Sequence, residues 1–153
     1  MRYLTMAGAL GLAALTGCAT VPREQPITIS LTGTSTEVQS FIEDKVKSTA
    51  NNPFEVYSAD DRSIVFKADC MSVLDMNAFS CAVIMMTVGN SGWDGPHLMM
   101  SFRTTSYKGI VKVSGISNWC ATNAFNKTNC GFALGTTNMN SFLRTIEASY
   151  NQR

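Results

Sequence analysis

The spacing of apolar residues along the chain switches between a period of two and a period near 3.6. Apolar and hydroxyl residues alternate over 27–32, which predicts a half-buried strand. Over 36–50 the apolar residues recur at helical spacing, which predicts an amphipathic helix. Thr36 and Gln39 match a capping box at its start, and Asn-Asn-Pro at 51–53 is expected to end it.

The middle of the chain favours a sheet. Segments with a period of two predict strands at 54–57, 64–70, 98–103 and 110–116. Lys108-Gly109 is typical of a tight hairpin turn. Residues 71–79 are ambiguous, with room for one helical turn, and the continuous apolar run at 82–88 predicts a central strand buried on both faces. Residues 118–130 are expected to form an Asn-rich loop, followed by a short strand at 132–134.

A second amphipathic pattern covers 138–150, with Thr137 or Asn138 as its expected cap. Two such helices each need an apolar surface to cover, and an antiparallel sheet offers one. The sequence therefore predicts an α+β fold for a single domain over 27–153. We expect a two-layer sandwich, in which two helices (36–50 and 138–150) pack on one face of a mostly antiparallel sheet of about five to six strands.

The start of the chain has the pattern of an export signal. Met1-Arg2 gives a positive start, and the apolar run over 3–15 is shorter than the roughly 20 residues that a transmembrane helix needs. The residues Leu15-Thr16-Gly17-Cys18 resemble the lipobox of bacterial lipoproteins. The resemblance implies that residues 1–17 are removed and that Cys18 carries acyl chains that anchor the protein stably. Residues 18–26 would then form an extended tether.

The same resemblance implies a location in the cell envelope. In enteric lipoproteins an aspartate after the cysteine commonly retains the protein in the inner membrane, whereas Ala19 stands here, which favours the outer membrane and a domain facing the periplasm. Removal of residues 1–17 would take away one of the 12 Lys+Arg, Arg2, and leave 11 against 11 Asp+Glu. A chain without net charge shows no basic excess for nucleic acid.

Four further cysteines indicate two disulfides. Cys70, Cys81, Cys120 and Cys130 form an even set, as expected for an oxidising compartment. Three pairings are possible, and we favour Cys70–Cys81 with Cys120–Cys130 because each pair joins close neighbours across a loop. Metal binding is the alternative, but neither spacing resembles the CxxC pair of zinc sites.

A soft-metal site is the second chemical hypothesis. His97 and Met99 are expected to share a strand face, with Met85 on the preceding strand, and such donors suit Cu(I) or Ag(I). Against this, the methionines lie in runs typical of a core. No cofactor is expected, because no phosphate-binding loop or dinucleotide motif occurs. Ser91, Asp94 and His97 have the residue types of a hydrolytic triad, but they lie within one turn-rich stretch, which argues against an enzyme.

Binding of a partner is therefore the favoured function. Trp93 lies in a Gly-rich loop, and Trp119 and Phe125 lie around the second cysteine loop. Tryptophan is a frequent anchor of protein interfaces, although it also anchors loops to a core. We expect a lipid-anchored, non-enzymatic accessory protein or adaptor that binds another envelope component, with an envelope protein as the expected partner. The alternative is a periplasmic carrier of a soft metal ion or a small apolar ligand.

Overall fold

Two long antiparallel strands organise the sheet of the computed structural model, which describes residues 24–153 except 74–75, 89–93 and 134. The sheet has six strands in the order β1-β5-β4-β3-β2, and β6 also pairs with β5. Their bounds are β1 Thr28–Thr32, β2 Glu55–Ala59, β3 Ser63–Asp69, β4 Asp94–Tyr107, β5 Ile110–Thr122 and β6 Thr128–Ala133. Because β1 pairs with the first half of β5 and β6 with the second half, these two strands share one edge of β5.

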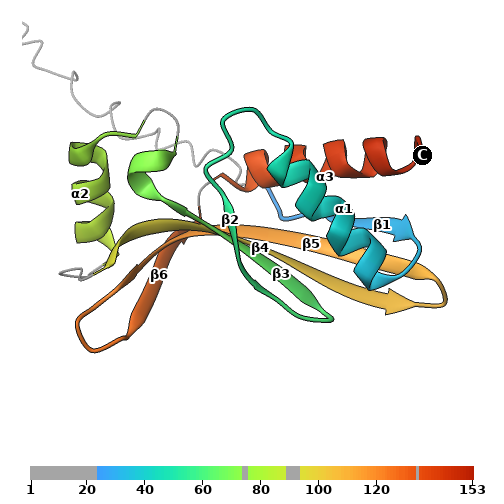
Figure 1. Cartoon of the computed structure of the whole chain (residues 1–153), viewed down its shortest axis with the longest axis horizontal. Helices are drawn as coiled ribbons and strands as arrows, with labels where there is room; N and C mark the ends of the chain where they lie inside the picture. The colour runs from blue at the N-terminus through green and yellow to red at the C-terminus, as the bar shows by residue number, and fades with distance from the viewer. Residues whose placement is uncertain (1–23, 74–75, 89–93, 134) are drawn as a thin grey trace, which may run out of the picture.

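Three helices lie on one side of this sheet (Figure 1). They are α1 Ser35–Lys47, α2 Ala78–Thr87 and α3 Thr136–Tyr150, and a short 3-10 turn, η1 Cys70–Ser72, precedes α2. Helices α1 and α3 cover one end of the sheet and α2 covers the other. The predicted α+β class and the helices near 36–50 and 138–150 are confirmed, but the described part of the chain has three α-helices, not two. No helix within the described ranges is long and apolar enough to cross a bilayer.

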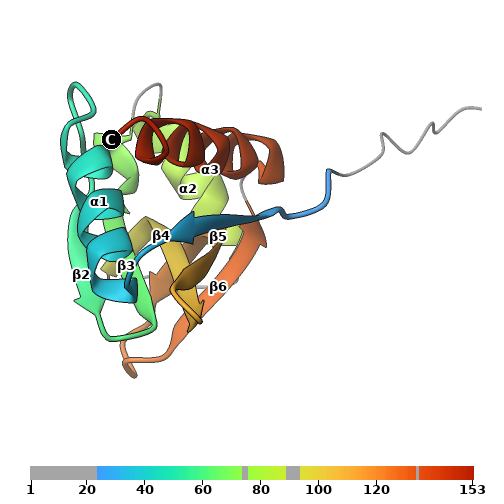
Figure 2. The ribbon, with the colours of Figure 1, turned by 90° about the vertical axis from the view of Figure 1, so that its right-hand side faces the viewer.

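The larger hydrophobic core lies between the sheet and the pair α1 and α3, which lie side by side in Figure 2. Alternate residues of the strands point toward it, as the period of two predicts: Ile64 and Phe66 from β3 and Phe102 from β4. The helices contribute their residues at 3.6-residue spacing. These are Val38, Phe41, Ile42 and Val46 from α1, and Met139, Leu143 and Ile146 from α3.

Gly115 of β5 allows α3 to approach the sheet closely. A Cβ atom at this position would lie 2.6 Å from the Met139 sulfur and 3.2 Å from a ring carbon of Phe102. We expect Gly115→Val to lower the free energy of unfolding by about 1–3 kcal/mol, since overpacking forces side chains from their rotamers. Urea unfolding measures this, with Gly131→Val as the control because a Cβ there would meet nothing within 4 Å. Equal losses in both variants would contradict it.

A smaller hydrophobic cluster lies under α2 at the other end of the sheet. It contains Cys70, Cys81, Leu98 and Trp119. The run 82–88 is thus part of a helix, and the prediction of a central strand there is wrong. A short apolar run without periodicity does not distinguish a strand from a helix. Asn77 favours the helix, because its side chain accepts a hydrogen bond from the Ser80 N–H at 2.8 Å and caps the first turn.

Three predicted boundaries also differ from the structure. The capping box of α1 is made by Thr34 and Glu37, not by Thr36 and Gln39, and the Glu37 carboxylate accepts from the Thr34 N–H at 2.8 Å. Helix α3 begins after Gly135, which has a left-handed backbone (φ 53°), so it has no side-chain cap. The expected loop at 118–130 is largely strand, since only 123–127 separate β5 from β6.

Both disulfide pairings are confirmed. Cys70 is bonded to Cys81, and the bond ties η1 to α2. Cys120 is bonded to Cys130, which lies directly opposite it on β6. Two disulfides are consistent with an extracytoplasmic location.

Candidate functional site

Helix α2 is apolar on all sides but packs on the sheet with one side only. Its sequence, AFSCAVIMMT, contains no charged residue. Cys81 is buried and Ile84 is partly buried against the cluster below. On the other side Phe79 is 77% exposed and Met86 is 72% exposed. A helix that is apolar all round is normally enclosed by protein or lipid, so this exposure requires an explanation.

The exposed apolar side chains of α2 form one continuous line. Phe79, Ala82, Val83 and Met86 are all exposed and follow one another at spacings of three and four residues, which places them on one face of a helix. We call these four residues the α2 stripe. Met71 of η1, 63% exposed, adds another apolar side chain in the segment that the Cys70–Cys81 bond joins to α2.

Local structure holds the α2 stripe in a fixed position. Asn77 caps the N-terminal end, and Val88 closes the C-terminal end by donating its N–H to the Ile84 carbonyl at 2.9 Å. The disulfide at Cys81, in the second turn, joins the helix covalently to η1 at the end of β3. A helix tied in this way presents its exposed face with little loss of conformational entropy on binding.

Among the residues that the structure describes, the other large exposed apolar side chains do not form a comparable surface. Tyr57 lies beneath the Lys67 ammonium, 5.8 Å from its ring centre, and Tyr107 is contacted in the same way by Lys108 at 5.2 Å. Ile116 is 51% exposed on β5, on the face of the sheet opposite the helices. Scattered exposed side chains of this kind are normal in folded proteins, whereas a continuous apolar stripe indicates an interaction surface.

The structure changes the set of partner-binding residues predicted from the sequence. Trp119 is 1% exposed and belongs to the cluster under α2, so it is a core anchor and its assignment to a partner-binding surface is wrong. Phe125 is 91% exposed at the tip of the β5–β6 hairpin, where Asn123 accepts hydrogen bonds from the backbone of the turn. Trp93 and Cys18 lie outside the described residues.

The structure separates one of the three candidate soft-metal donors, Met85, from the other two. His97 and Met99 share one face of β4, as expected. Met85 lies on α2 and not on a strand, and α2 covers the opposite face of the sheet, where Leu98 points. The proposed set of His97, Met99 and Met85 is therefore wrong. His97 is instead buried, with its Nδ1 2.8 Å from a carboxylate oxygen of Asp69.

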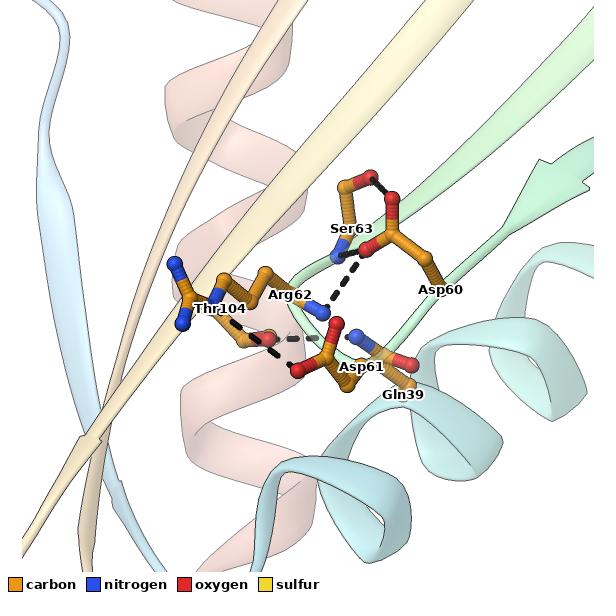
Figure 3. A network of polar contacts seen from close by, with 6 residues as sticks. All are labelled: Gln39, Asp60, Asp61, Arg62, Ser63 and Thr104. Carbon is orange, nitrogen blue, oxygen red and sulfur yellow. Dashed lines mark hydrogen bonds and ion pairs between the residues drawn. The ribbon is translucent and has the colours of Figure 1, made fainter.

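A polar hollow of about 530 Å³ lies beside the β2–β3 turn and is lined by residues 60–63 and 103–105. One of its two acidic groups, Asp60, builds the turn (Figure 3). One oxygen of Asp60 accepts the N–H groups of Arg62 and Ser63, and the other accepts the Ser63 hydroxyl. Nearby, Gln39 of α1 donates to the Thr104 hydroxyl at 3.1 Å. We assign this network to turn structure, since both carboxylate oxygens of Asp60 are already engaged.

The Asp60 turn should make stability depend on pH. The Arg62 N–H, followed by the Ser63 hydroxyl, holds the pKa of Asp60 below its ordinary value. The stabilisation is therefore present above the unfolded-state pKa, near 4, and is lost as the pH falls through the folded-state pKa. We expect Asp60→Asn to show a smaller fall in the urea midpoint than wild type between pH 5 and pH 2. An unchanged slope would contradict this role.

Folding alone does not explain why the apolar side chains of the α2 stripe are exposed. The sequence analysis missed this stripe because the apolar run 82–88 favours a strand, although Asn77 is a signal for the start of a helix and Phe79, Val83 and Met86 have helical spacing. Its function has to be inferred from this chain's own residues. Comparison of the chain with protein-family models, with curated proteins and with solved structures gave no match.

Proposed function

We propose that this chain is a lipid-anchored envelope lipoprotein that acts as a non-enzymatic adaptor and docks another envelope protein on the α2 stripe. The observation that carries the proposal is the exposed, uncharged line of Phe79, Ala82, Val83 and Met86 on a helix that a disulfide holds in place. The sequence resemblance at Leu15–Cys18 supports the anchor. The outer membrane, with the domain facing the periplasm, is the location that we propose.

A lipid on Cys18 would keep the domain close to the membrane. The Gln25 carbonyl accepts a hydrogen bond from the Asn140 amide at 2.8 Å, and the Asn140 oxygen accepts from the Ile27 N–H at 3.0 Å. The chain is thus fixed to α3 from Gln25 onward. Seven peptide units separate Cys18 from Gln25, which allows a reach of about 25 Å at most. An adaptor held in this way would meet partners at or near the membrane surface.

The chemistry of the α2 stripe favours a protein partner over a lipid surface. Helices that lie in the membrane interface usually carry Lys or Arg beside their apolar face, and the segment 70–88 contains neither. Methionine is common at protein surfaces that adapt to a partner, because its flexible thioether fills irregular space. Apolar positions spaced by three and four residues are also what a helix presents to a groove or to a second helix.

The test is capture of the partner from detergent-solubilised envelopes with the lipidated protein. We expect the double variant Phe79→Ser/Met86→Ser to reduce capture of a specific envelope protein by at least about 30-fold, because truncation of a central interface anchor costs about 2 kcal/mol or more. Thermal unfolding should change little, since both side chains are more than 70% exposed.

The matched control is Tyr107→Ser/Ile110→Ser, which removes exposed apolar side chains from the β4–β5 hairpin. This variant should capture the partner as wild type does. Equal capture by wild type and by the α2 variant would overturn docking on the α2 stripe. Absence of any specific protein with the wild type would overturn the adaptor proposal itself.

A further inference from the structure

The two disulfides lie in different surroundings. Cys70 and Cys81 are 3% and 6% exposed and lie in the apolar cluster under α2. Cys120 is 5% exposed, but its partner Cys130 is exposed on β6, which pairs with β5 at the edge of the sheet. A thiol in solution can approach Cys130 without any opening of the core, whereas it cannot approach Cys70 or Cys81. Accessible disulfides are the ones that tend to be labile or catalytic.

The sheet places Cys120 in a row with a histidine and an aspartate. In the strand pairing Asp69 of β3 is opposite His97 of β4, His97 is opposite Cys120 of β5, and Cys120 is opposite Cys130 of β6. Directly opposed residues of antiparallel strands point to the same face, with Cβ atoms about 4.5–5.5 Å apart. The row faces away from the helices, because the next residues on β4 and β5 point into the core under α2.

The histidine of this row is buried beside a carboxylate. Its Nδ1 lies 2.8 Å from a carboxylate oxygen of Asp69, and the residue is 8% exposed. His97 thus stands between a carboxylate on one neighbouring strand and the buried cysteine of the disulfide on the other.

We propose that the Cys120–Cys130 disulfide is a site of thiol–disulfide exchange that oxidises exposed dithiols of other proteins, with His97 as the acid for the departing Cys120 sulfur. This disulfide and the α2 stripe lie on opposite sides of the sheet. His97 and Cys120 share the face away from the helices, whereas Cys70 and Cys81 lie in the apolar cluster under α2.

The exchange is balanced in two steps. A substrate thiolate attacks the Cys130 sulfur, a mixed disulfide forms, and the Cys120–Cys130 bond breaks with its electron pair on the Cys120 sulfur, which takes a proton from His97. The second thiol of the substrate then attacks the substrate sulfur of the mixed disulfide and releases Cys130 as a thiol. The dithiol loses two electrons and becomes a disulfide, while Cys120 and Cys130 end as thiols.

The experiment is timed reduction of the mature protein with dithiothreitol, followed by alkylation and mass spectrometry of each cysteine. Cys120 and Cys130 should become alkylated faster than Cys70 and Cys81 by on the order of 100-fold, because the buried bond needs local opening. His97→Ala should slow reduction of Cys120–Cys130 by about 10-fold, since a thiolate that is not protonated or stabilised leaves more slowly. Added imidazole should restore part of that rate.

The second disulfide and a neighbouring residue provide the controls. The reduction rate of Cys70–Cys81 reports general loosening of the fold and should stay unchanged in His97→Ala. Met99→Ala, on the same face of β4, should leave both rates at the wild-type values. Equal reduction rates for the two disulfides would overturn the proposal. An unchanged or faster Cys120–Cys130 rate in His97→Ala, or no recovery with imidazole, would overturn the role of His97.

Discussion

Replacement of Trp119 by alanine should lower the free energy of unfolding by about 3–5 kcal/mol, the range for loss of a buried aromatic side chain. Trp119 is among the largest fully buried side chains and packs with Leu98, Cys70 and Cys81 under α2. Its removal would leave a cavity between the sheet and α2, and the disulfide would prevent the helix from collapsing into it. The loss should therefore lie toward the upper part of the range.

Urea unfolding of Trp119→Ala and of Phe125→Ala measures the loss in the free energy of unfolding. Phe125→Ala is the matched control, because Phe125 is 91% exposed and its truncation should change the free energy of unfolding by less than about 0.5 kcal/mol. A loss below about 1 kcal/mol for Trp119→Ala would show that the cluster under α2 does not pack as described. It would also restore Trp119 as a candidate for contact with a partner.

Removal of the Cys70–Cys81 disulfide has the second-largest expected effect. The double variant Cys70→Ala/Cys81→Ala should lose about 2–3 kcal/mol of stability, because the closed loop is short and a 15-residue loop is worth about 3 kcal/mol. The bond also ties α2 to the end of β3. Its loss should therefore weaken partner capture, since the α2 stripe would have to be ordered on binding.

The second disulfide is a control of nearly equal loop length. The sequence separation is 11 residues for Cys70–Cys81 and 10 for Cys120–Cys130. Cys120→Ala/Cys130→Ala should therefore cost a similar amount of stability but leave partner capture unchanged at a temperature where both variants are folded. Equal loss of capture in the two variants would contradict a specific role of the first disulfide in presenting α2.

The fold was predictable where the apolar period was long and clear. The alternation around Ile64 and Phe66 and the helical spacing from Met139 to Ile146 led to the observed strand and helix. The prediction of a strand at 82–88 was wrong because a continuous apolar run has no period. The cap at Asn77 is the signal that distinguishes the helix. The length of β5 was underestimated because its second half, through Asn118, Trp119 and Cys120, does not alternate regularly.

The functional surfaces were less predictable, because they depend on which face of an element remains uncovered. The sequence pointed to the tryptophans, and the structure buries Trp119. No pattern within one segment shows that Phe79 and Met86 stay exposed, since that depends on which other elements pack on α2 in the fold. The row of Asp69, His97 and Cys120 likewise depends on strand register, which joins residues far apart in sequence.

Photo-crosslinking in living cells tests docking on the α2 stripe most directly. A photoreactive amino acid would replace Met86 in the full-length chain, and the same amino acid would replace Ile110 at the β4–β5 hairpin as control. We expect a discrete crosslink to one envelope protein from position 86 and none from position 110, and loss of that crosslink when Phe79 is changed to serine. The same pattern of crosslinks from both positions, or none from position 86, would contradict docking on the α2 stripe.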